Sequence, residues 1–149
     1  MKITKHNLLF FFSILGLIFS SYLVYLHYTP VELQASFCNL NDYFSCATVN
    51  TSTYSYFLGV PVAIIGALGF LVNILLLLFR PKYYEVLVFC SYLIALLFMF
   101  YLTIAELFFI HAVCVLCVST AIIVLILFFL SFSLFKEDVF TFLKEIKLE

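Results

Sequence analysis

Four long apolar runs dominate the chain, and short polar segments separate them. Each run is about 20 residues or longer, the length that a helix needs to cross the roughly 30 Å hydrocarbon core of a bilayer. The runs are nearly free of charge, with Glu85 near one end of the third. The pattern predicts an all-α membrane protein, a four-transmembrane-helix bundle. The predicted spans are residues 8–28, 58–79, 84–104 and 112–135.

The composition agrees with a chain that lies in lipid. Hydrophobic residues make up 66% of the 149 residues and charged residues 10%, whereas a soluble domain carries about 25% charged residues. Because so few charges cannot cover a water-facing surface, we expect residues 1–149 to form one membrane domain. The net charge of −1 gives no indication of nucleic-acid binding, and we expect none.

The basic residues fall on one side of the predicted spans. They precede the first run, lie between the second and third, or follow the fourth. They are Lys2, Lys5, Arg80, Lys82, Lys136, Lys144 and Lys147. Because cytoplasmic loops are enriched in Lys and Arg, we expect cytoplasmic termini, with residues 136–149 as a cytoplasmic tail. No small-residue cleavage site follows the first run, so we interpret it as an uncleaved span.

The segment at residues 29–57 has no Lys or Arg and is predicted to lie on the outer face. It is long for a loop in a compact protein, which makes it a candidate functional region. Thr29-Pro30 ends the preceding helix, and residues 47–57 are expected to form a short surface helix. Pro61 then suits the first turn of the second span, where a missing N–H is tolerated.

Four of the five cysteines fall on or near this outer face, where disulfides are chemically permitted. Cys38 and Cys46 lie in the loop, and Cys114 and Cys117 form a C-x-x-C at the start of the fourth span. A helix N-terminus favours a thiolate, so the two pairs predict a thiol–disulfide relay. Cys90, inside the third span, is interpreted as a small apolar filler.

Other interpretations of the cysteines remain open at this point. Cys38 and Cys46 alone are also compatible with a static disulfide, and the chain with a non-enzymatic tetraspan scaffold. A scaffold would tolerate serine at Cys114 and Cys117. Four cysteines can bind zinc, but the C-x7-C spacing lies outside the usual ligand pattern, and we predict no metal site.

The order of these features resembles the vitamin K epoxide reductase family over residues 8–135. A wide cysteine pair is followed by G-V-P at the second span and by C-x-x-C at the fourth. The stretch "CATVNTSTYSYFLGVP" matches the family pattern of a loop cysteine, then Val, Ser and Gly at set distances. Here these residues are Cys46, Val49, Ser52 and Gly59.

The resemblance implies a membrane oxidoreductase that takes electrons from a thioredoxin-like protein and passes them to a quinone. It assigns Cys38 as the exposed residue that exchanges with the partner. Cys46 attacks Cys114, and Cys117 is released facing the quinone. Ser52 is placed to hydrogen-bond a quinone oxygen, although a helix N-cap is an alternative role.

Further quinone contacts are less specific. His111, three residues before Cys114, and Phe57 are candidate quinone-binding residues, but both residue types are also common at membrane interfaces and in apolar packing. Glu106 falls in the predicted outer turn, and we expect it to be solvated.

Two departures from the vertebrate members change the expected substrate. Ala121 stands where they carry a tyrosine, and Asn73 lies too near the inner end to match their second-span asparagine. This favours the bacterial and archaeal branch, which uses ubiquinone or menaquinone to drive disulfide formation in exported proteins. Vitamin K quinone or epoxide reduction is the alternative. We therefore expect a prokaryotic cytoplasmic membrane and, since no thioredoxin-like domain follows, a separate partner protein.

Overall fold

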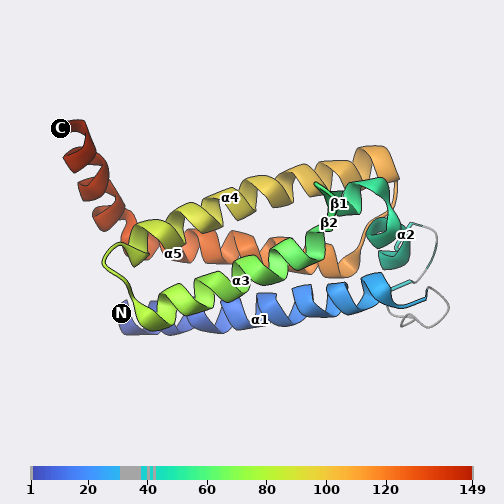
Figure 1. The fold of residues 1–149 in the computed structure, drawn as a ribbon, viewed down its shortest axis with the longest axis horizontal. Helices are drawn as coiled ribbons and strands as arrows, with labels where there is room; N and C mark the ends of the chain where they lie inside the picture. The colour runs from blue at the N-terminus through green and yellow to red at the C-terminus, as the bar shows by residue number, and fades with distance from the viewer. Residues whose placement is uncertain (1, 31–37, 40, 42, 149) are drawn as a thin grey trace.

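Four long helices lie side by side in an elongated bundle, which confirms the predicted fold class (Figure 1). The computed structural model describes residues 2–30, 38–39, 41 and 43–148. The long helices are α1 (Lys2–Tyr28), α3 (Val62–Phe79), α4 (Tyr84–Ile104) and α5 (Val115–Leu148). Their apolar stretches, long enough to cross a membrane, are Thr4–Tyr28, Val62–Phe79, Tyr84–Ile110 and Val115–Lys136.

Both termini lie at one end of the bundle, which we call the terminal end, together with the α3–α4 turn (Figure 1). In that turn, Arg80 adopts a left-handed conformation with φ 46° and ends α3, and Pro81 follows it. The Arg80 guanidinium donates a hydrogen bond to His6 Nε2 at 2.8 Å, which links the turn to α1. Helix α5 continues beyond the apolar stretch, and its last part leaves the bundle at an angle.

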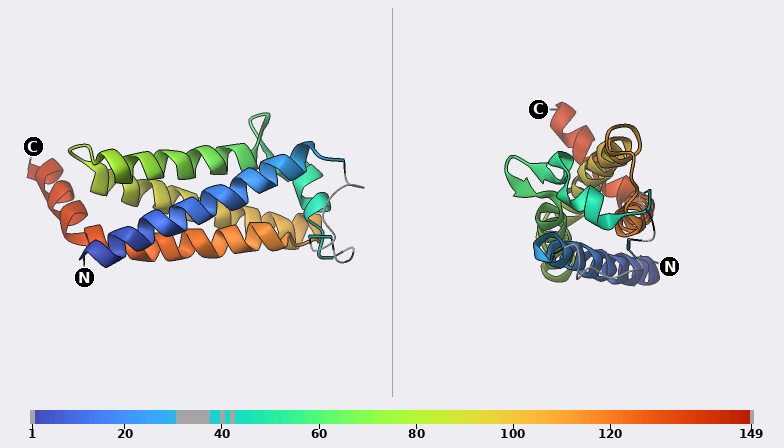
Figure 2. Two further views of the ribbon diagram at one scale, coloured as in Figure 1. Left: turned by 90° about the horizontal axis from the view of Figure 1, so that it is seen from below. Right: turned by 90° about the vertical axis from the view of Figure 1, so that its right-hand side faces the viewer.

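A small cap covers the opposite end of the bundle, as Figure 2 shows from that side. The cap contains α2 (Cys46–Thr51), a 3-10 turn (Thr53–Ser55) and a two-stranded antiparallel hairpin of β1 (Tyr56–Phe57) and β2 (Val60–Pro61). Leu58 and Gly59 form its turn with φ of 53° and 82°, the positive values that tight hairpin turns need.

The surface helix predicted for residues 47–57 is therefore only partly correct, because α2 ends at Thr51. Ser52 is extended, and its hydroxyl donates to the Val49 carbonyl at 2.7 Å. Such local side-chain bonds to the backbone compete with helix continuation. Because α2 is shorter than predicted, Tyr56 and Phe57 can form β1, which pairs with β2 directly before the start of α3.

Polar side chains inside the bundle pair with one another across the helices. The hydroxyls of Ser13 on α1 and Tyr92 on α4 lie 2.7 Å apart. Ser91 on α4 donates to Asn73 Oδ1 on α3 at 2.6 Å. In lipid no water is available to satisfy such groups, so these bonds hold the helices in register.

Helices α1 and α3 approach closely at positions that lack bulky side chains. The Phe70 ring occupies the space that a side chain at Gly16 would fill. At Gly66 an added Cβ would lie 3.3 Å from the Ser20 hydroxyl, whereas at Gly69 it would meet nothing within 4 Å. Gly16 is therefore a packing requirement, and Gly69 is not.

We expect Gly16→Ala to lower the free energy of unfolding by about 1–3 kcal/mol, because the new methyl group forces Phe70 to move. Gly69→Ala is the matched control, and we expect it to be neutral or to stabilise by up to about 1 kcal/mol through helix propensity. The measurement is the unfolding midpoint of each variant in detergent. Equal midpoints for the two variants would contradict the α1–α3 packing described here.

Candidate active site

The cysteines of the loop form a disulfide at the start of α2. Cys38 and Cys46 are bonded with their Cα atoms 5.4 Å apart, and Cys46 N–H donates to the Cys38 carbonyl at 2.9 Å. The Ser45 hydroxyl caps α2 by accepting a hydrogen bond from Thr48 N–H at 3.2 Å. This hydrogen bond fixes the start of α2, so Cys46 lies on the first turn of a helix.

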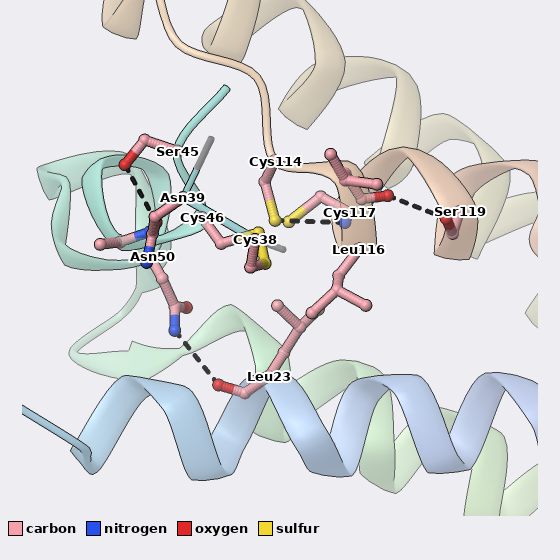
Figure 3. Close-up of a disulfide and its surroundings, with 12 residues drawn as sticks. Leu23, Cys38, Asn39, Ser45, Cys46, Asn50, Cys114, Leu116, Cys117 and Ser119 are labelled. Atoms are coloured by element: carbon pink, nitrogen blue, oxygen red, sulfur yellow. Dashed lines mark hydrogen bonds between the residues drawn. A yellow bond between two sulfur atoms is a disulfide. The ribbon is translucent and has the colours of Figure 1, made fainter. Parts of the chain in front are cut away.

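Cys38 is buried with 0% exposure, so the prediction that it is exposed is wrong for this conformation. The disulfide packs in an apolar cluster between α1, α2 and the start of α5 (Figure 3). The buried members of this cluster are Leu23, Leu26, Cys38, Cys46, Val49, Ala112, Cys114 and Leu116. Burial shields the sulfur atoms from water and from thiols in solution.

Backbone hydrogen bonds attach the loop to the segment that carries the second cysteine pair. Val113 N–H donates to the Tyr43 carbonyl at 2.7 Å, and Phe44 pairs with Val113 as a parallel bridge. Within the loop, the Asn39 side chain holds the start of α2, because its Oδ1 accepts from Ala47 N–H at 3.0 Å. The residue next to Cys114 is thereby tied to the loop that ends in Cys46.

Cys114 stands immediately before α5 and occupies its N-cap position. Its carbonyl accepts from Val118 N–H at 3.0 Å, and its Sγ accepts from Cys117 N–H at 3.3 Å (Figure 3). A helix N-terminus provides these unpaired N–H groups, and they stabilise a negatively charged sulfur. Cys114 and Cys117 are both free cysteines, so the C-x-x-C pair is reduced while the loop pair is oxidised.

Three sulfur atoms meet in the buried cluster. The Sγ atoms of Cys38, Cys46 and Cys114 all lie within 4.8 Å of one another. Thiol–disulfide exchange needs a thiolate next to a disulfide sulfur, and Cys114 has this position. The two cysteine pairs that are far apart in the sequence are therefore neighbours in the fold.

A cavity lies beside Cys117, between the cap and the helices. Its volume is about 70 Å³, several times the roughly 10–15 Å³ that one water molecule needs. Polar side chains line part of it, namely Ser20, Asn50, Ser52, Tyr54, Ser55, Thr103, Glu106, Cys117 and Thr120. Gly66 and Met99 also line a second, apolar cavity of about 510 Å³ between α3 and α4, so the two cavities adjoin.

The three residues predicted to bind quinone lie in different places relative to the two cavities. Ser52 lines the smaller cavity together with Cys117. It ends α2 and occupies the N-cap position of the 3-10 turn, where its side chain makes no capping hydrogen bond. Phe57 lines the larger cavity and packs edge to face on Phe98, with ring centroids 5.7 Å apart. His111 is exposed, has φ 55° and does not line either cavity.

Glu106 is a site residue that the sequence analysis missed. It was predicted to be solvated, but it is 5% exposed and lines the smaller cavity. The third span continues beyond the predicted end at residue 104 as a π-helical segment (Ala105–Ile110), which carries Glu106 inward. Glu106 Oε2 accepts from Cys114 N–H at 3.3 Å, and its carboxyl group also hydrogen-bonds the Cys117 thiol. A lone acidic residue in an apolar stretch was the available signal.

A helical membrane bundle that buries a disulfide beside a reduced C-x-x-C pair has the architecture of a membrane thiol–disulfide oxidoreductase. Residues 7–132 match the vitamin K epoxide reductase family, and the chain belongs to that family. Its members are oxidoreductases that use quinones as electron partners. Comparison with individual curated proteins gives no match.

The sulfur geometry predicts which cysteines cross-link. Replacing Cys38 and Cys117 with serine leaves Cys46 and Cys114 within 4.8 Å, and we expect them to form a disulfide in air. Mass spectrometry of unreduced peptides detects this bond.

The matched control is the same protein with Cys114 also replaced by serine, which leaves Cys46 with Cys90 in the third span. We expect no intramolecular disulfide there. An absent Cys46–Cys114 bond in the first variant would show that the two pairs do not meet.

Proposed function

We propose that the protein is a quinone-dependent thiol–disulfide oxidoreductase that oxidises a thioredoxin-like partner and passes the electrons to a membrane quinone. The observation that carries the proposal is the meeting of Cys38, Cys46 and Cys114 within 4.8 Å, with Cys117 opening into the adjacent cavity. One end of this relay is a disulfide, and the other end lines a cavity that adjoins the larger apolar cavity.

Electrons enter at the loop pair in this scheme. A partner dithiol reduces the Cys38–Cys46 disulfide by thiolate attack on Cys38, and the partner leaves with its own disulfide. Since Cys38 is buried, this exchange requires the cap to move. The Cys46 thiolate then attacks Cys114 of an oxidised C-x-x-C pair, which breaks the Cys114–Cys117 bond and releases Cys117.

The internal transfer ends in the redox state of the structure. Cys38 attacks Cys46 in the Cys46–Cys114 bridge, which restores the Cys38–Cys46 disulfide and leaves Cys114 and Cys117 reduced. These two thiols then give two electrons to the quinone and form their own disulfide, while the quinone takes up two protons. The net change is partner dithiol plus quinone to partner disulfide plus quinol.

The two cavities suit a lipid quinone as the acceptor. Cys117 and Ser52 face the smaller, more polar cavity, where the ring would bind. The larger cavity is lined by apolar side chains such as Phe57, Ile94 and Phe98, and it suits an isoprenoid tail. For Ser52 to donate to a quinone oxygen, its hydroxyl must turn away from the Val49 carbonyl. His111, which is exposed, is given no quinone contact in this scheme.

The charge pattern supports an orientation with the cap outside. Arg80 and Lys82 lie in the turn at the terminal end, and the basic residues near both termini belong to the same end. The positive-inside rule then places this end in the cytoplasm and the cysteines on the outer face. We infer a prokaryotic cytoplasmic membrane, ubiquinone or menaquinone as acceptor, and disulfide formation in exported proteins as the outcome.

The test is quinone reduction by the purified protein with a reduced thioredoxin-fold donor and a short-chain ubiquinone or menaquinone. We expect turnover by the wild type and none by Cys117→Ala, because that variant has no sulfur at the cavity. Cys90→Ala is the matched control and should keep full activity. A folded wild type that reduces neither quinone would instead favour a scaffold with a static loop disulfide.

A further inference from the structure

Reduction of a quinone by two thiols moves two protons as well as two electrons. We propose that Glu106 is a catalytic residue whose carboxyl group takes the proton of the Cys117 thiol and delivers it to a quinone carbonyl oxygen. The inference rests on the proposed function and adds the proton path to it.

Glu106 interacts with both residues of the C-x-x-C pair, with the backbone of Cys114 and with the thiol of Cys117. It accepts a hydrogen bond from Cys114 N–H at 3.3 Å. The Cys117 thiol hydrogen-bonds the side chains of Cys114 and Glu106. A proton that leaves Cys117 therefore has a carboxyl group as its neighbouring acceptor, on the wall of the cavity where the quinone would bind.

No cation balances this carboxyl group within the cavity. Among the described residues that line it, none is Lys, Arg or His, and Glu106 is the only acidic one. An ionised carboxylate buried without a partner is costly in lipid surroundings. A carboxyl group that alternates between its neutral and charged forms avoids a permanent charge, and its neutral form can donate a hydrogen bond to a quinone oxygen.

Most hydroxyl groups around the cavity already donate to backbone carbonyls. Ser52 and Ser55 donate at 2.7 Å, Thr120 at 2.8 Å and Thr103 at 2.9 Å. Each of these hydroxyl groups would have to break its hydrogen bond to a carbonyl before it could donate one to a quinone oxygen. Glu106 differs from them because it can both accept and donate a full proton beside the reacting sulfur.

The segment that carries Glu106 is also unusual. Residues 105–110 form a π-helical turn rather than continuing α4. Such turns occur often at functional sites, because the added residue changes the direction in which side chains point. Here the turn brings a charged residue of a long apolar span to the N-terminus of α5.

The step balances in atoms and electrons. The Cys117 S–H bond breaks and its proton passes to a Glu106 carboxylate oxygen. The two thiols lose two electrons to the quinone as the Cys114–Cys117 disulfide forms. Protonated Glu106 then gives its proton to one quinone oxygen and returns to a carboxylate, and the Cys114 thiol supplies the second proton of the quinol.

A purely structural role for Glu106 predicts a different result from the same substitution. The carbonyl oxygen of glutamine still accepts from Cys114 N–H, but its amide cannot take up and release a proton as a carboxyl group does. Glu106→Gln therefore keeps the hydrogen bond that holds the start of α5 and removes only proton transfer. Glu85→Gln, at the other end of the same apolar span, is the matched control.

The experiment follows single-turnover oxidation of the pre-reduced full-length protein by two oxidants, a short-chain ubiquinone and dipyridyl disulfide. Dipyridyl disulfide oxidises thiols without needing a protonated quinone. We expect Glu106→Gln to slow oxidation by the quinone about 100-fold, the lower end of the usual effect of a general acid–base group. Oxidation by dipyridyl disulfide should slow much less, because only removal of the thiol proton is lost there and no proton has to be delivered to a quinone. Glu85→Gln should match the wild type with both oxidants.

The possible outcomes separate the two hypotheses. Equal slowing with both oxidants would show that Glu106 delivers no proton to the quinone and would overturn the proposal, and unchanged quinone oxidation would remove Glu106 from the mechanism. A wild type that reacts with dipyridyl disulfide but with no quinone would overturn the proposed function and the proton path together. If Glu106→Gln does not fold, Glu106→Ala replaces it. Formate should then restore quinone oxidation where chloride does not, and equal rates in the two salts would overturn the proposal.

Discussion

The hydrogen bond from Val113 N–H to the Tyr43 carbonyl holds the two cysteine pairs together. The loop and α5 are separated by two transmembrane helices in the sequence, so nothing in the local chain brings them into contact. At 2.7 Å, with Phe44 paired beside it, this bond attaches the loop to the residue before Cys114. This attachment holds Cys114 beside the disulfide, where the three sulfur atoms lie within 4.8 Å of one another.

Burial in an apolar cluster of the protein explains the chemistry that the cap permits. The sulfur atoms lie in an apolar cluster with Leu23, Leu26 and Leu116, so the disulfide is shielded from thiols in the surrounding solution. In the proposed relay, this shielding lets electrons pass between neighbouring sulfurs without loss to other acceptors. The same shielding makes movement of the cap part of the proposed exchange with a partner protein.

The buried polar groups of the bundle fall into two kinds. Ser13 with Tyr92, and Asn73 with Ser91, satisfy each other across helices and hold the bundle together. Glu106 is different, because it contacts the reactive cysteines and lines a cavity with no cation beside it. In a membrane protein, where every buried charge is costly, this contrast distinguishes a structural polar contact from a chemical one.

The sequence by itself determined the number of spans, the fold class and the four cysteines. These features depend on local properties: the length of apolar runs, the absence of charge within them and the C-x-x-C spacing at a helix start. The placement of both pairs on one face predicted a relay, but proximity depends on the folded chain, so the specific contact between Cys46 and Cys114 was implied only by the family resemblance. The tertiary structure alone decided the burial of Cys38 and the inward position of Glu106. Both result from packing between segments distant in sequence and from a π-helical turn, which the periodicity of the apolar residues does not reveal.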